Sequence, residues 1–181
     1  MPGSVGKIAG CAAVLAAVGL LSFGLPALND EIPAQRLISA TEPYGIGLGV
    51  EVTPPMHTVV DARGTAPATN LVLFVREGVE YRLQASPYPG TAATLADALR
   101  GDLAHARGAQ AVGPAIPMST AHGVHGVAAR FEESNGAGLI AAFVDGGVGV
   151  DVLVSGTDQG MIVNGDDILD SVATLRFEDR H

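Results

Sequence analysis

The longest apolar stretch of the chain lies close to its start. Residues 8–28 contain no charged side chain, and about 20 apolar residues in a helix cross a hydrocarbon core of ~30 Å. Lys7 precedes this stretch, and Asp30 and Glu31 follow it. Because positive charge stays on the cytoplasmic side of a membrane, residues 1–28 are predicted to be a single-pass anchor with a cytoplasmic N-terminus and an extracytoplasmic C-terminal domain.

A cleaved secretory signal is the alternative for this segment, and it would give a secreted protein. The apolar region of a signal peptide is normally about 7–15 residues long. Ser22-Phe23-Gly24 offers a cleavage site with small residues, but Pro26 follows closely, so we favour the uncleaved anchor. Cys11 lies near the start of the apolar stretch instead of ending it, so we do not expect a lipidated cysteine.

The segment after the anchor has a different pattern. Residues 29–44 contain Pro33 and Pro43, mix polar groups with apolar ones and have little periodicity. They are predicted to be a linker with a short helical piece around residues 35–39. Residues 45–181 form the predicted extracytoplasmic domain, which is long enough to bury a single core.

Alternation of apolar and polar positions, or short apolar runs, predicts several strands in this domain. These strands cover residues 49–53, 71–75, 79–86, 124–131, 138–144 and 148–154. Glu77-Gly78, Asn135-Gly136 and Asp145-Gly146 are typical of hairpin turns. Gly113-Pro114 to Pro117 is interpreted as a proline-punctuated stretch between elements.

Two segments have the periodicity of an amphipathic helix. Residues 91–107 begin at Thr91 or Thr94 and end before Gly108, which are favourable capping residues. A C-terminal helix is predicted to begin at Asp166 or Asp167. Its core-facing residues are predicted to be Ile168, Leu169, Val172 and Leu175. Strands joined by hairpins, interrupted by two helices, indicate an α+β fold in which two helices pack on an antiparallel sheet.

Three parts of the domain carry a resemblance to a known group of proteins. They are Gly49-Val50-Glu51-Val52-Thr53-Pro54, Thr120-Ala121-His122-Gly123-Val124-His125-Gly126, and Asp166-Asp167-Ile168-Leu169-Asp170-Ser171-Val172 leading to Phe177. Together with the helix and the membrane segment, they resemble small exported or membrane-anchored actinobacterial proteins with a PsbP-like, LpqN-type α/β/α sandwich. The resemblance implies a largely non-enzymatic binding or accessory role in the cell envelope, and it supplies no catalytic residues.

Composition and charge exclude several functions. The 181 residues include 19 Asp and Glu but only 10 Lys and Arg, which gives a formal net charge of −9. Nucleic-acid binding depends on clustered Lys and Arg, so we expect no nucleic-acid partner. The chain is 48% hydrophobic but only 4% aromatic, without Trp. One anchor and a domain rich in Ala and Val account for this excess of apolar residues.

Candidate chemistry is sparse. His122 and His125 are the only local histidine pair, but three residues apart in an extended segment they point to opposite faces. They are weak candidates for binding, and we expect no metal site. Gly45-x-Gly47-x-Gly49 lacks the preceding strand and following helix of a nucleotide loop, so we expect no nucleotide and no other cofactor. Asp158, Asp166, Asp167 and Asp170 do not have the spacing of a calcium loop.

Two functional hypotheses follow. The first is a membrane-anchored extracytoplasmic ligand-binding or protein-interaction module of the bacterial cell envelope with no catalytic site. Its partner would be an envelope protein, or an apolar envelope molecule held between sheet and helix. The alternative is an envelope hydrolase that uses His122 or His125 with a nearby Asp, which requires a histidine and a carboxylate within hydrogen-bonding distance.

Overall fold

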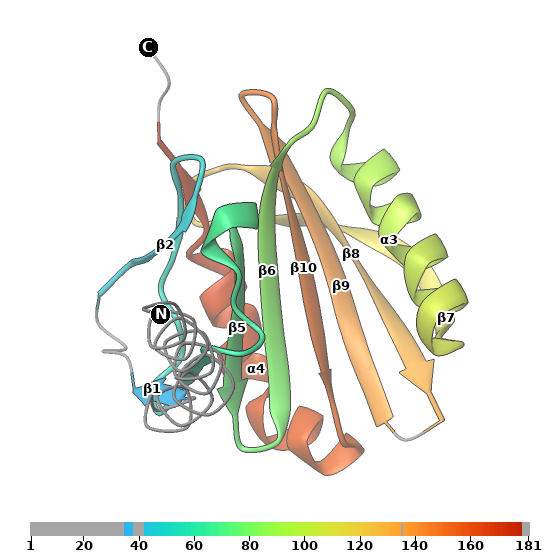
Figure 1. Ribbon diagram of the computed structural model, residues 1–181. Coiled ribbons are helices and arrows are strands. Elements are labelled where there is room, and N and C mark those ends of the chain that lie inside the picture. Colours follow the sequence, from blue (N-terminus) through green and yellow to red (C-terminus); the bar gives the residue numbers. More distant parts are fainter. Residues whose placement is uncertain (1–34, 38–41, 135, 179–181) are drawn as a thin grey trace, which may run out of the picture. The chain divides into compact units, whose positions relative to one another are not determined.

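The described part of the chain is built on a large antiparallel sheet. The computed structural model describes residues 35–37, 42–134 and 136–178. Within them, an eight-stranded sheet has the order β1-β4-β5-β6-β10-β9-β8-β7, and each strand pairs with its neighbour in antiparallel fashion (Figure 1). The strands are β1 (Gln35–Leu37), β4 (Val59–Asp61), β5 (Leu71–Arg76), β6 (Val79–Pro87), β10 (Val148–Gly156), β9 (Gly136–Asp145), β8 (His125–Glu133) and β7 (Gln110–Ser119).

Two helices and a smaller sheet pack against this sheet. Helix α3 (Ala92–Arg107) and helix α4 (Asp158–Ala173) lie on opposite faces (Figure 1). A three-stranded antiparallel sheet has the order β11-β3-β2; its strands are β11 (Arg176–Phe177), β3 (Val50–Val52) and β2 (Tyr44–Gly47). A short 3₁₀-helix, η2 (Pro67–Thr69), precedes β5. The predicted α+β class, with an antiparallel sheet and two helices, is confirmed.

The alternation along the strands places one core on each face of the sheet. On one face, alternate residues of β6 and β10 pack with α4 and the three-stranded sheet; they include Tyr81, Leu83, Val150, Val152, Ile168 and Val172. On the other face, α3 packs on β8 and β9 through Leu95, Leu99, Leu103, Phe131, Ile140 and Ala142. Because a strand points successive side chains to opposite faces, β9 and β10 contribute to both cores.

The segments with the clearest local signals fold as predicted. Glu77 and Gly78, both with positive φ, join β5 to β6, as a type I′ hairpin requires. Thr91 caps α3, and its side chain and that of Thr94 form a reciprocal capping box. Gly108, at φ 65, ends the helix in the left-handed conformation.

Helix α4 begins eight residues before the predicted start at Asp166 or Asp167. Thr157 is its N-cap, and the Thr157 side chain accepts a hydrogen bond from the Gly160 amide at 3.2 Å. Gly160, Asn164 and Gly165 have low helix propensity, so the sequence pattern conceals the first half of this helix. Tertiary packing compensates for this low helix propensity. Gly160 lies close to Val79, and the buried Asn164 donates to the Gly160 carbonyl.

Strands at both edges of the sheet were also not predicted. The proline-punctuated stretch belongs to β7, which tolerates Pro114 and Pro117 because edge strands need fewer ladder hydrogen bonds. The helical piece predicted around residues 35–39 is wrong for Gln35–Leu37, which pairs with β4 as strand β1.

The turn between β9 and β10 also differs from its prediction. It is Gly146-Gly147, one residue later than predicted, and both glycines have positive φ.

Several predictions concern the N-terminal segment. Residues 1–34, which include the predicted anchor and Cys11, lie outside the described residues, as does Asn135 of one predicted turn. Within the described residues, neither helix has the length and apolar character needed to span a membrane.

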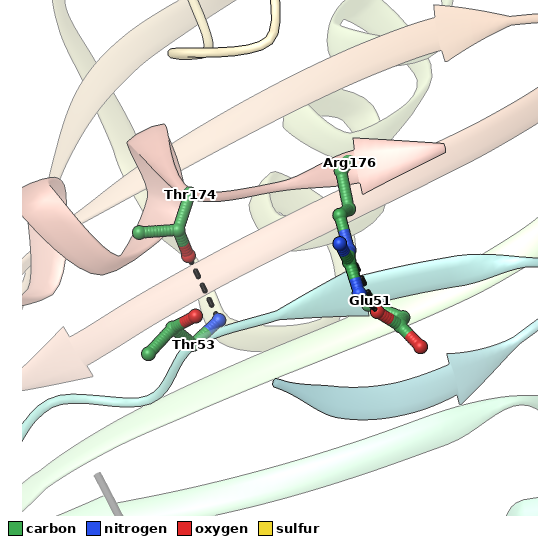
Figure 2. A network of polar contacts seen from close by, with 4 residues as sticks. All are labelled: Glu51, Thr53, Thr174 and Arg176. Atoms are coloured by element: carbon green, nitrogen blue, oxygen red, sulfur yellow. Dashed lines mark hydrogen bonds and ion pairs between the residues drawn. The ribbon is translucent and has the colours of Figure 1, made fainter. Parts of the chain in front are cut away.

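A polar network attaches the C-terminal end of α4 to β3 (Figure 2). The Thr53 amide donates to Thr174 Oγ1 at 2.8 Å, and the Ser171 hydroxyl donates to the Thr53 carbonyl at 2.7 Å. Beside them, Arg176 Nε donates to Glu51 Oε2 at 2.7 Å. Both backbone groups of Thr53 therefore depend on side chains at the end of α4.

These contacts predict unequal effects of two substitutions. Ser171→Ala leaves a half-buried carbonyl without its partner, so we expect a loss of about 1–3 kcal/mol in the free energy of unfolding. Arg176→Gln breaks an ion pair in contact with solvent, for which we expect a loss of about 1 kcal/mol or less. Urea unfolding followed by circular dichroism measures both. Equal losses would show that the Thr53 carbonyl does not depend on Ser171.

One carboxylate on the α3 face of the sheet is unfavourably placed. Asp151 of β10 is half-buried, and burial raises the pKa of its carboxyl above the ordinary value. Arg82 opposes this shift of the pKa, and Asp102 adds to it. The folded state therefore binds the Asp151 proton more tightly than the unfolded state does.

This difference predicts a stabilising substitution with a defined pH dependence. The contribution of Asp151 is most favourable below the ordinary pKa of Asp, and it is lost as the pH rises through the raised pKa. We expect Asp151→Asn to unfold at higher urea concentration than the wild type at neutral pH, and this advantage to disappear below about pH 4. The exposed Asp97→Asn is the control and should show no such trend. An advantage of Asp151→Asn that persists in acid would contradict the explanation.

Candidate binding groove

The two histidines singled out by the sequence have separate surroundings. His122 lies in the turn between β7 and β8 and lines a small hollow of about 190 Å³ beside Glu51 and Arg176. His125 begins β8, and its Nδ1 lies 2.9 Å from Oγ of Ser119 at the end of β7. Both rings are exposed, and no hydrogen bond joins them. Within the described residues, no three His, Cys, Asp or Glu side chains converge to hold a metal ion.

The contact between Ser119 and His125 does not form a catalytic arrangement. A serine nucleophile needs a histidine base that a third group orients and a site that excludes water. In the described part of the chain, no carboxylate hydrogen-bonds to His125, and both Ser119 and His125 are open to solvent. The hydrolase hypothesis required a histidine bonded to a carboxylate, and the described residues provide no support for it.

The hollow beside His122 has little capacity to bind an anion. Its one arginine, Arg176, is already paired with Glu51 (Figure 2). The other polar groups there, Thr53 and Thr174, bond to each other through the Thr53 amide. The structure therefore uses these side chains to attach α4 to β3.

A larger concave surface lies elsewhere, between α4 and the β7 end of the sheet. It consists of two hollows of about 350 and 550 Å³. Arg130, Leu139 and Leu169 line both hollows, so the two adjoin, and we call them together the α4 groove. Both hollows are partly open to solvent.

Apolar side chains from the helix and the sheet form the walls of the α4 groove. Helix α4 contributes Met161, Ile162, Leu169 and Ala173, and the sheet contributes Ile116, Met118, Ala128 and Leu139. Ile162 is 78% exposed and Ile116 is 59% exposed, although large aliphatic side chains are normally buried. Leu169, predicted to face the core, is half-buried and faces the groove. The groove therefore presents a largely apolar surface to solvent.

Charged side chains occupy the edges of the α4 groove. Asp158, Asp166 and Asp170 line it from α4, and Arg130 lines it from β8. None of these four forms an ion pair with a described residue. On the far side of α4, by contrast, Asp167 pairs with Arg76 at 2.6 Å.

Sequence reasoning missed this groove because both its walls were misread. One wall includes residues of β7, for which the prolines led us to predict a loop. The other includes Asp158 and Ile162, in the half of α4 that the weak helix formers concealed. The available signal was the spacing of Asp158, Ile162, Asp166 and Leu169, which repeats every three or four residues on one face of a helix.

Comparison with solved structures identifies the fold. The solution structure of cyanobacterial PsbP (CyanoP) from Synechocystis sp. PCC 6803 superposes with a TM-score of 0.56 at 14% identity, covering 76% of this chain and 92% of that chain. A crystal structure from Bacteroides thetaiotaomicron VPI-5482 covers 81% of this chain and 49% of that chain at 13% identity, with a TM-score of only 0.38.

Sequence comparison adds no family to this result. No family model matches the chain, and no curated protein matches its sequence. The PsbP-like part of the sequence prediction is confirmed at the level of the fold, whereas the LpqN-type assignment stays a prediction. The described domain has a PsbP-like α+β fold.

Proposed function

We propose that this protein is a non-catalytic interaction module of the cell envelope, anchored to the membrane by residues 8–28, that binds a partner in the α4 groove. The observation that carries the proposal is the groove itself, a largely apolar surface with Ile116 and Ile162 on opposite walls. Exposed apolar patches of this kind, bordered by polar residues, are typical of interaction sites. The extracytoplasmic location follows from the charge pattern around residues 8–28.

The shape of the groove favours a macromolecular partner over a small ligand. Small-molecule sites usually bury most of the ligand surface in a cleft. Both parts of the α4 groove are partly open to solvent, so a small apolar molecule there would keep part of its surface in contact with water. A protein segment can cover such a groove and shield both walls at once.

Site-specific photo-crosslinking in native membranes tests this function. A photoreactive amino acid replaces Ile116 or Ile162 in the full-length protein, and matched variants carry it at Ala104 or Ala106, which are exposed on α3. We expect crosslinked products from the groove positions to exceed those from the α3 positions several-fold. Equal labelling from both surfaces, or no product from the groove, would refute the proposal.

A further inference from the structure

We infer that the α4 groove accepts an amphipathic α-helix of another protein, with its apolar stripe on the groove floor and its Lys and Arg residues toward α4. This inference rests on the proposed function and specifies the class of partner. The groove, its length and the charges on its edges each constrain that partner.

The length of the groove matches that of a helix. Its lining includes Asp158, the first residue of α4, and Ala173, the last. It therefore follows the whole of this 16-residue helix, which corresponds to roughly 24 Å at 1.5 Å per residue. A partner helix of about four turns, with apolar residues at i, i+3, i+4 and i+7, would cover this length.

The α4 edge of the groove requires positive charge from its partner. Asp158, Asp166 and Asp170 are separated by eight and four residues and lie on one side of α4. They are exposed and have no ion pair within the described residues. Lys and Arg on the adjacent flank of a partner helix would complement this edge, and charge complementarity selects partners and orients them.

The opposite wall carries one positive charge that would determine the register. Arg130 lies where the two hollows meet, opposite Leu139 in the β8–β9 pair, and it has no ion pair among the described side chains. A single Asp or Glu near the middle of the partner helix, on its other flank, would meet Arg130. The expected partner helix is therefore basic along one flank and acidic at one point on the other.

Other occupants fit these charges poorly. A second copy docked through the same groove would offer only Arg130 to the three aspartates of each α4 edge, because a two-fold interface pairs the same surface of both copies. Residues 8–28 of this chain contain no charge to meet either edge. An anionic lipid surface would be repelled by the three aspartates.

Selection from a peptide library tests the inference without a known partner. The displayed peptides span about four helical turns, have Leu fixed at the i, i+3, i+4, i+7 spacing, and carry Lys, Gln or Glu at random on both flanks. They are selected on the full-length protein in nanodiscs of phosphatidylcholine, after depletion on empty nanodiscs. We expect enrichment of Lys along one flank and of Glu at one position on the other.

Variants of the groove assign each preference to its residue. Asp166→Asn with Asp170→Asn should reduce the Lys enrichment, whereas the α3 pair Asp97→Asn with Asp102→Asn, which changes the net charge equally, should not. Arg130→Glu should convert the central preference from Glu to Lys. An equal effect of the α3 pair would show that net charge, not the groove, selects the peptides.

The remaining outcomes separate the class of partner from the proposed function. Failure to enrich any helix, or enrichment of Glu or Gln along the α4 flank, would overturn the basic-helix inference. If photo-crosslinks to another molecule still form at Ile116 and Ile162, the proposed function stands with a partner of another kind, such as a lipid or a second copy. If those crosslinks are also absent, the proposed function fails as well.

Discussion

The width of the sheet is the constraint on which the other features depend. Neighbouring strands lie about 4.8 Å apart, so eight of them extend across roughly 34 Å, whereas one helix with its side chains is about 10 Å wide. On the α4 face, the three-stranded sheet and α4 cover the strands near β6 and β10. The strands toward β7 extend beyond this cover. The α4 groove is the space that results, and its apolar walls are the uncovered continuation of the core.

Attachment at the C-terminal end of α4 determines where this helix can lie. Ser171 and Thr174 bond both backbone groups of Thr53, and at the other end Gly160 allows close contact with Val79. The helix is therefore held at both ends toward the β6 side of the sheet. That position leaves Ile162 and Leu169 facing outward beside β9, although Ile168 and Val172 of the same helix are fully buried.

The sequence predicted the elements whose signals are local and failed where tertiary contacts decide. The β5–β6 hairpin and α3 were predictable because Glu77-Gly78 and Thr91 act within a few residues of themselves. The first half of α4 was not predictable, because Gly160 and Asn164 stabilise the helix only through their contacts with β6 and with the core. The candidate site was likewise not predictable, because it depends on tertiary contacts. His122 and His125 attracted attention by residue type, but catalysis and metal binding need side chains to converge, and spacing in the chain does not determine that.

The prolines of β7 have a consequence for how the protein can associate. Strand β7 forms a free edge of the large sheet, and Pro114 and Pro117 lack the amide hydrogens that an added strand would need from it. A bulge between Val112 and Ile116 also interrupts the regular register of this edge. Polymerisation by strand exchange or cross-β stacking is therefore disfavoured at an edge that exposes Val112 and Ile116. The apolar side chains of the α4 groove can therefore stay exposed while the backbone at this edge of the sheet resists aggregation.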